Sequence, residues 1–436
     1  MSTQPSLSPR PIKHMAAGDL RSYFRLLRHN PAFTRFWLAG VISHIGNWFN
    51  YIGIFVLLSS HTGSGQAVSW FLIAKFLPAF LWGPMAGVVA DRLPRKMIMI
   101  AGDLIRAVLV LGYLFVDSAD YLWLVYVLAL SQETVWSFTD PARRASVPNL
   151  CAKEELKVAN SLSGATWSVM LAVGAALGGF VTALFGWQTA ILVDAATFIL
   201  SAAILTTLPL PHQRRAKPAI TSWSSLIGLT DLQEGWRYIL QRKETMRLIL
   251  VKSGWAMAGG IMVMLTVFGE QVFGGENGGK SGILYSARGI GAALGPVTAW
   301  KLFGEERPEM IRAIGFGFFM AAASYLCFSQ SPSLIPAAFF VFFAHLGGSV
   351  QWVFSTTILQ ETVPDSFRGR VFAAEMGLLT LVLSISTWLT GFILDLGADP
   401  RLVTAGLAAC FLLPGLAWSM TAILPAGAAN AQSKKQ

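Results

Sequence analysis

Long apolar blocks alternate with short polar connections along almost the whole of this 436-residue chain. Each block contains roughly 20 mainly apolar residues, the length that a helix needs to cross the hydrocarbon core of a bilayer. The pattern therefore predicts an all-α polytopic membrane protein with twelve transmembrane helices. The predicted spans are 36–58, 67–90, 97–117, 121–142, 158–185, 187–208, 247–272, 280–302, 311–329, 333–357, 371–395 and 402–424.

The basic residues follow the alternation of the connections. Every second connection is rich in Lys and Arg, whereas the intervening ones contain only Lys280 and Arg401. Basic connections stay on the cytoplasmic side of a membrane, so we expect both termini to be cytoplasmic and the protein to lie in the plasma membrane. The net charge of +10 is then a consequence of topology, and it gives no reason to expect binding to nucleic acid.

A basic stretch with several prolines interrupts the apolar pattern at mid-chain and divides six predicted spans from six. The two parts resemble each other, because Gly83-Pro84 late in the second span recurs as Gly295-Pro296 late in the eighth. We expect two related halves joined by a linker. The predicted regions are a cytoplasmic tail at 1–33, a six-helix half at 34–208, a cytoplasmic linker at 209–243, a second six-helix half at 244–425 and a cytoplasmic tail at 426–436.

The connection after the second span carries one acid followed by three bases, in the spacing G-x-x-x-D-R-x-x-R-K. The residues are Gly87, Asp91, Arg92, Arg95 and Lys96. A lone carboxylate at the end of a membrane helix needs a partner, because an unpaired charge near hydrocarbon is costly. We expect a conformational latch in which Asp91 pairs near Arg370, at the start of the eleventh span, with Arg143 as a further basic member.

Polar groups inside predicted spans are candidates for function. Glu133 lies near the middle of the fourth span, and a carboxyl group held away from water is able to exchange a proton near neutral pH. Glu133 is therefore our first candidate for proton coupling or substrate contact. The alternative is a structural pair with a base such as Lys75 or Arg106.

Further charges lie in other predicted spans. Asp103 and Arg106 are spaced i, i+3 and favour a structural or gating pair, whereas Asp194 serves either coupling or packing. Lys75 and Lys252 are expected either to attract an anionic substrate or to neutralise an intramembrane acid. Aromatic walls suit large amphipathic substrates, although simple packing is the alternative. The candidate cavity aromatics are Trp48, Trp136, Trp167 and Trp352.

The charged connection closely resembles the loop signature of the major facilitator superfamily of transporters, with Pro94 in place of the usual glycine. Further segments resemble the bacterial branch that includes the enterobactin exporter and macrolide efflux proteins. They include S-H-I-G-N-W from Ser43 to Trp48 and S-A-R-G-I-G-A-A-L-G from Ser286 to Gly295. The resemblance implies parallel six-helix repeats with a substrate path between them.

The fifth span contains a glycine-rich element that looks like one found in antiporters of this superfamily. Its glycines are Gly174, Gly178 and Gly179, with Ala175 where the antiporter element has proline. Gly174 and Gly178 also make a small-x-x-x-small face, so close helix packing explains the element equally well.

The expected function is secondary active transport by alternating access. We expect a proton-coupled exporter of an amphipathic small molecule, either a siderophore or a drug-like compound. The alternatives are uptake or flipping of a nutrient or lipid, and a polytopic membrane enzyme or receptor. The short connections show no catalytic cluster or nucleotide-binding loop, so we expect no enzyme activity. We expect a monomer in membrane lipid that binds a small-molecule substrate and protons, with no cofactor and no metal.

Overall fold

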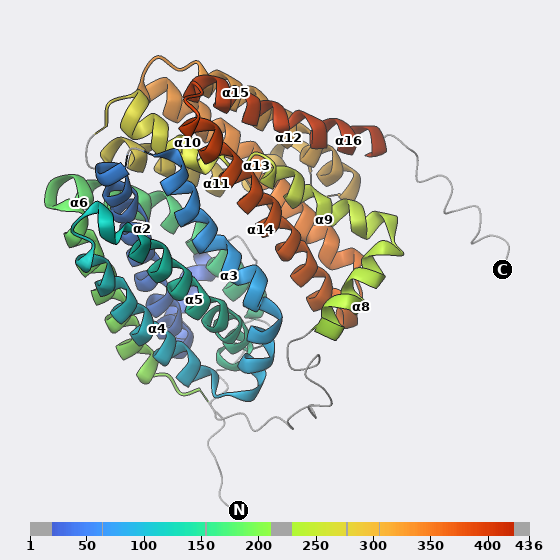
Figure 1. Ribbon diagram of the computed structural model, residues 1–436. Coiled ribbons are helices and arrows are strands. Elements are labelled where there is room, and N and C mark those ends of the chain that lie inside the picture. The colour runs from blue at the N-terminus through green and yellow to red at the C-terminus, as the bar shows by residue number, and fades with distance from the viewer. Residues whose placement is uncertain are drawn as a thin grey trace, which may run out of the picture.

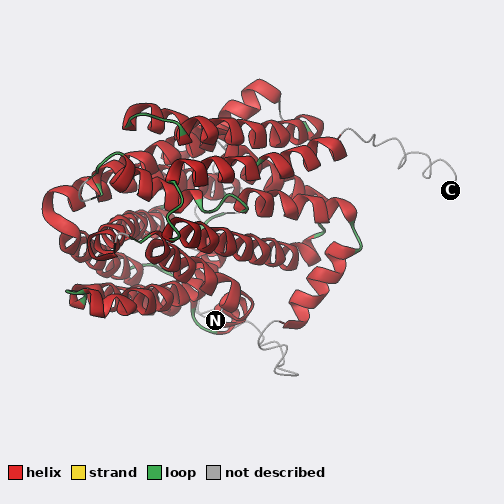
Figure 2. Ribbon diagram, turned by 45° about the horizontal axis from the view of Figure 1, so that its top comes forward, coloured by secondary structure: helices red, strands yellow, loops and turns green. Residues whose placement is uncertain are grey.

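The computed structural model describes residues 20–62, 64–152, 155–210, 229–275, 278–304 and 306–422. In these ranges the secondary structure is helical, and no strand occurs (Figure 2). The side chains of a few helical residues, Asp91 and Arg92 among them, are outside the description. The prediction of an all-helical fold is confirmed for the described residues.

The first half of the chain contains six α-helices and two short 3-10 turns. They are α1 (Leu20–His29), α2 (Pro31–Thr62), α3 (Gly65–Arg92), α4 (Arg95–Leu111), η1 (Gly112–Phe115), η2 (Ala119–Tyr121), α5 (Leu122–Leu150) and α6 (Leu156–Thr206). The second half contains α8 (Leu229–Leu240), α9 (Lys243–Ala256), α10 (Ile261–Val267), the π-turn η3 (Phe268–Val272), α11 (Gly279–Phe303), α12 (Arg307–Ser329), α13 (Leu334–Thr362), α14 (Asp365–Asp395), α15 (Pro400–Cys410) and α16 (Leu412–Ala422).

Nine helical stretches within the described ranges are long and apolar enough to cross a membrane, so the chain is a multi-pass membrane protein. One of them, Val158–Thr206, includes both the fifth and the sixth predicted spans. Helices α5 and α11 coincide with the fourth and eighth predicted spans and are not among the nine. The total of twelve crossings stays a prediction.

A single glycine separates the fifth predicted span from the sixth. Gly186 has φ 82° and ψ 164°, a conformation that is essentially restricted to glycine, and it interrupts the helical geometry inside α6. The sequence places the break between residues 185 and 187, where the predicted spans end and begin. The break therefore divides α6 at the position where the apolar pattern predicts a connection.

The helices form two bundles that lie side by side, with α2–α6 in one and α9–α16 in the other (Figure 1). The main contacts between the bundles are made by two helix pairs, α3 with α14 and α6 with α11. At the second contact the helices approach to backbone distance, because a Cβ atom on Gly179 would lie 3.1 Å from the Cα atom of Gly282. Each half therefore contributes two helices to the main contact between the bundles.

Two segments outside the predicted spans are also helical. Helix α1 falls within the predicted tail and packs on the first bundle through the fully buried Leu26, and the predicted boundary at residue 33 falls inside α2. Helix α8 belongs to the predicted linker and packs on α14 and α9. The structure does not describe residues 211–228, so most of the linker lies outside the described residues.

Candidate functional site

An ion pair joins two helices of the first bundle at the position of the leading candidate acid. Nζ of Lys75 on α3 lies 2.6 Å from Oε1 of Glu133 on α5, and each side chain keeps 15% of its surface accessible. Helices α3 and α5 pack against each other through their apolar side chains, and this packing brings Lys75 and Glu133 together. The structure thus pairs Glu133 with a base, as the structural alternative requires, but leaves both groups accessible to solvent or substrate.

Aromatic rings connect this pair to the second bundle. Nζ of Lys75 lies 5.9 Å from the centroid of the Tyr51 ring, and the Tyr51 ring lies 5.6 Å from that of Tyr285 on α11. Trp48 and Phe55 on α2 also contact Tyr285, with centroid distances of 6.0 Å each. We call Trp48, Tyr51, Phe55 and Tyr285 the aromatic seam. The Lys75–Glu133 pair lies next to the contact between the two halves.

A second charged cluster is buried within the first bundle. Arg106 donates to Oδ1 of Asp103 at 2.5 Å, and the hydroxyl of Ser201 donates to Oδ2 at 2.6 Å. The guanidinium of Arg143 lies 4.0 Å from the same carboxylate. Two cations therefore surround one acid that is almost inaccessible to solvent. The arrangement fits the predicted i, i+3 pair, and it shows Arg143 beside Asp103 inside the bundle.

Asp194 is fully buried on α6 and faces α2. Its Oδ1 atom would lie 2.5 Å from a Cβ atom placed on Gly46, so the glycine makes room for the carboxylate. The hydroxyl of Thr197 donates to Oδ1 at 3.5 Å, while Oδ2 has no hydrogen-bond partner in the described part of the chain. A buried carboxyl oxygen without a donor is costly unless the group is protonated.

The second bundle contains a more deeply buried pair. Nζ of Lys252 on α9 lies 2.8 Å from Oε2 of Glu375 on α14, and the side chains are 4% and 0% accessible. The sequence drew attention to Lys252 but not to Glu375. The missed signal is an acid near the start of the apolar eleventh span, in Val371-Phe372-Ala373-Ala374-Glu375-Met376.

The predicted latch residues make contacts within their own halves. Arg95 donates to the carbonyl of Ala145 and to Asn149, and Lys96 donates to the carbonyls of Thr206 and Leu208 at the end of α6. Arg370 is paired with Glu234 of α8 at 2.8 Å. Gly87 lies in α3, and the side chains of Asp91 and Arg92 fall outside the described residues, so the proposed partner of Arg370 is not placed.

The four predicted tryptophans occupy different surroundings. Trp48 belongs to the aromatic seam, whereas the Trp352 ring lies 4.8 Å from Nζ of Lys252 and 6.4 Å from the Trp255 ring. Trp136 is partly buried one turn from Glu133, and more than half of Trp167 is exposed. Trp48 and Trp352 therefore belong to two clusters, one in each half, rather than to one wall.

The glycines of the fifth span serve close helix packing. A Cβ atom on Gly174 would lie 2.8 Å from the Trp48 ring, and one on Gly178 would lie 2.9 Å from the Trp48 carbonyl oxygen. Gly179 faces Gly282 of the other half. This is the structural explanation that the small-x-x-x-small spacing predicts.

At the end of the bundles where α2 ends, an acid of one half caps a helix of the other. The hydroxyl of Ser64 donates to Oδ2 of Asp395 at 2.6 Å, and the backbone N–H of Gly65 donates to Oδ1 at 2.9 Å. These groups begin α3, whereas Asp395 ends α14. A carboxylate at a helix N-terminus is stabilised by unsatisfied N–H groups and by the helix dipole. This inter-half cap joins the halves at one end of the molecule.

Metal-binding clusters of three or more His, Cys, Asp or Glu residues are absent from the described ranges. The chemistry available at the site therefore consists of charged pairs, unpartnered buried oxygens and aromatic rings. Of these groups, the Lys75–Glu133 pair and the aromatic seam lie beside the contact between the two bundles.

Comparisons with other proteins agree with this architecture. The sequence pattern of the Major Facilitator Superfamily matches residues 36–374. Macrolide efflux protein A of Streptococcus pyogenes is 24% identical over 83% of this chain and 89% of its own length. Enterobactin exporter EntS of Salmonella choleraesuis is 26% identical over 79% of this chain and 81% of its own length.

Solved structures show the same fold at low identity. The nucleoside transporter NupG has a TM-score of 0.65 and 13% identity, covering 90% of this chain and 99% of its own. A POT family transporter in complex with 5-aminolevulinic acid has a TM-score of 0.71 and 9% identity, covering 94% of this chain and 98% of its own. The extent of the family match and the shared helical fold together show that this chain is a membrane transporter that belongs to the major facilitator superfamily.

Proposed function

We propose that the protein is a proton-coupled exporter that moves an amphipathic small molecule across the bacterial inner membrane by alternating access. The observation that carries the proposal is the Lys75–Glu133 pair. Both side chains remain partly accessible, and the pair lies beside the aromatic seam at which the halves meet. A carboxylate in this position is able to release its lysine partner when it takes up a proton or when substrate arrives.

Glu133 is the coupling acid in this mechanism. When the cavity faces one side of the membrane, Glu133 binds a proton, and Lys75 is freed to interact with substrate. When the cavity faces the other side, the proton leaves and the ion pair forms again. Asp194 and the Asp103–Arg106 pair are the next candidates for this role, because they are charged groups buried within predicted spans of the same half.

Alternating access needs contacts between the halves that form on one side at a time. The inter-half cap at Asp395 supplies such a contact at the end of the bundles where α2 ends. We assign the opposite end, with α1 and α8, to the cytoplasm, because its connections are the basic ones. The charged loop with Asp91, Arg92, Arg95 and Lys96 is then the latch that forms when the cytoplasmic end closes, with Arg370 exchanging Glu234 for Asp91.

The substrate class follows from the relatives and from the aromatic surroundings of the pair. Two relatives are named as exporters, one of macrolides and one of enterobactin, and both kinds of molecule are large and amphipathic. We propose export of a siderophore or a drug-like compound by a monomer, and we assign no enzymatic activity to the chain. Aromatic rings such as Trp48 and Tyr51 suit this class of ligand.

The test is transport in everted membrane vesicles with an imposed pH gradient. Radiolabelled erythromycin and enterobactin are offered separately, and uptake into the vesicles is compared for the natural protein and Glu133→Gln. We expect the rate of gradient-driven uptake of the transported compound to be at least about tenfold lower in the variant, because glutamine cannot exchange a proton. It should retain exchange of labelled for unlabelled substrate, since the substitution mimics the protonated state.

Asp120→Asn is the matched control, because Asp120 is an exposed acid in the η2 turn, outside the bundle. It should transport normally. Uphill transport by Glu133→Gln at the normal rate would show that Glu133 is structural. Suppose instead that uptake of labelled substrate is driven only by an outward-directed gradient of unlabelled substrate and does not depend on pH. That result would contradict proton coupling for the protein as a whole.

A further inference from the structure

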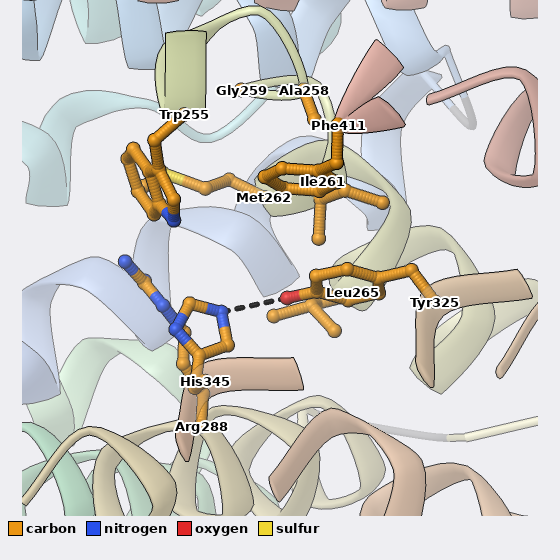
Figure 3. Close-up of a pocket in the computed structure, with 10 residues that line it drawn as sticks. All are labelled: Trp255, Ala258, Gly259, Ile261, Met262, Leu265, Arg288, Tyr325, His345 and Phe411. Carbon is orange, nitrogen blue, oxygen red and sulfur yellow. Dashed lines mark hydrogen bonds between the residues drawn. The ribbon is translucent and has the colours of Figure 1, made fainter. Parts of the chain in front are cut away.

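A small cavity lies within the second bundle, apart from the Lys75–Glu133 pair. Residues of five helices and of two turns, between α9 and α10 and between α15 and α16, line it, and it is walled mainly by aromatic and aliphatic side chains (Figure 3). Three polar side chains reach it from different helices: Arg288 of α11, Tyr325 of α12 and His345 of α13. All three are more than nine-tenths buried.

The guanidinium of Arg288 is the unusual group in this cavity. Arg288 lies near the middle of α11 and is only 8% exposed. Within the described ranges it forms no ion pair and no hydrogen bond, and its charge is met only by the Tyr285 ring at 5.9 Å. An arginine at this depth normally pairs with an acid, because an isolated buried cation is costly. The lining of the cavity contains no carboxylate.

The other polar groups of the cavity are also suited to an anion. The Tyr325 hydroxyl lies 2.6 Å from Nε2 of His345, so in the tautomer that accepts this hydrogen bond His345 has its proton on Nδ1. Figure 3 shows the Trp255 indole nitrogen on the side of the cavity that faces Arg288 and His345. Arginine and indole N–H groups are donors only. The cavity thus offers a fixed positive charge and neutral donors.

The cavity lies close to the expected path of the substrate. Arg288 is three residues from Tyr285, which belongs to the aromatic seam, and the next residue, Gly289, packs against Ala172 of the first half. The cavity has a volume of about 10 Å³, enough for a group of about the size of a water molecule. A ligand that contacts both halves is therefore able to place only one compact end in this cavity, with its carbon skeleton outside, toward the aromatic seam.

We propose that Arg288, with His345 and Trp255, forms a binding site for one compact anionic group, the carboxylate or phenolate of an amphipathic aromatic substrate. This inference rests on the proposed transport function and names the charge of the substrate. A free halide ion is also a compact anion and could occupy the same site. The experiment distinguishes an anionic group of the substrate from a free halide ion.

The experiment measures ligand binding to the purified full-length protein in detergent, with no membrane gradient. Sodium salicylate is the probe, salicylamide is its neutral counterpart, and sodium gluconate keeps the ionic strength constant. Binding is followed as the increase in melting temperature with ligand concentration, because a ligand that binds only the folded state stabilises it. We expect salicylate to raise the melting temperature with saturation and salicylamide to have no effect at the same concentrations.

Two variants locate the site. Arg288→Met should weaken salicylate binding by about tenfold or more, because a charge-assisted hydrogen bond is lost, and Arg288→Lys should bind with intermediate affinity. Lys301→Met is the matched control, since Lys301 is an exposed cation on the same helix, and it should bind salicylate normally. If Arg288→Met does not fold, His345→Gln with Arg288→Lys gives the same ordering of affinities.

Replacement of sodium gluconate by sodium chloride tests whether the site binds a free halide ion. Chloride that neither raises the melting temperature nor weakens salicylate binding at physiological concentration supports the substrate group. A saturating shift with chloride and none with salicylate would assign the site to a free halide and overturn the proposed substrate charge. Equal binding of salicylate to the natural protein and to Arg288→Met would overturn the site itself. These results do not depend on Glu133, so they are separate from the transport test.

Discussion

Two lysine–glutamate pairs lie within the membrane-spanning helices, one in each half, and they differ in exposure. Lys75 and Glu133 each keep 15% of their side-chain surface accessible, whereas Lys252 and Glu375 keep 4% and 0%. The distances are alike, at 2.6 and 2.8 Å. Their geometry is therefore similar, and the difference lies in what else is able to reach the charges.

The accessibility of a buried ion pair to water or substrate decides whether the pair takes part in transport or only stabilises the structure. A fully enclosed pair cannot exchange its partner for water or substrate, and removal of either member leaves an uncompensated charge. A pair that remains partly accessible keeps that freedom at the cost of a weaker interaction. We therefore expect the pair in the second half to stabilise the protein and the pair in the first half to serve transport.

The largest expected effect is on stability. Glu375→Gln leaves the ammonium of Lys252 buried without a counter-charge and should destabilise the protein by about 3–5 kcal/mol. Glu133→Gln should cost much less, because Lys75 is able to contact water. Thermal unfolding of the purified variants in the same detergent checks the order. Equal losses of stability would show that exposure does not separate the two pairs.

Double neutralisation sharpens the same comparison in transport. Lys252→Met combined with Glu375→Met replaces an enclosed pair by apolar side chains, and we expect it to retain most gradient-driven transport. Lys75→Met combined with Glu133→Met removes the accessible pair and should reduce that transport about tenfold or more. Vesicle uptake at matched expression is the measurement. Loss of transport in the first double variant alone would reverse the assignment of the two pairs.

The smallest expected effect concerns the contact between the halves. Asp395→Asn weakens the inter-half cap by about 1 kcal/mol and should shift the balance between closed and open states about fivefold. Hydrogen exchange of the backbone at residues 62–69 should accelerate accordingly. Asp399→Asn is the control, because Asp399 caps α15 within its own half. Faster exchange at residues 62–69 in that control as well would show that the cap does not hold the halves together.

The apolar pattern predicts the fold in detail because membrane spans have a fixed minimum length. The break at Gly186 falls between the predicted fifth and sixth spans. The predicted seventh and twelfth spans, in contrast, are each divided into two helices, α9 with α10 and α15 with α16, and hydropathy does not predict these breaks. The two short helices α1 and α8 show the limit of this argument. Their packing on the bundle depends on tertiary contacts, such as the burial of Leu26, that hydropathy does not report.

The candidate site was less accessible to sequence reasoning. A charge inside an apolar span is visible in the sequence, and this identifies Lys75, Glu133 and Lys252. Its partner depends on which helices pack together, and Glu375 lies 123 residues from Lys252 in the chain. Arg288 illustrates the same limit, because its isolation in a cavity becomes visible only in three dimensions.

The contact between Gly179 and Gly282 has a mechanical consequence. A Cβ atom on either glycine would lie only 3.0–3.1 Å from the Cα atom of the other, so the two halves touch through bare backbone at this point. Interdigitated side chains would have to separate before one helix could rotate against the other. A contact between backbones instead allows the two helices to rotate relative to each other while they remain in contact.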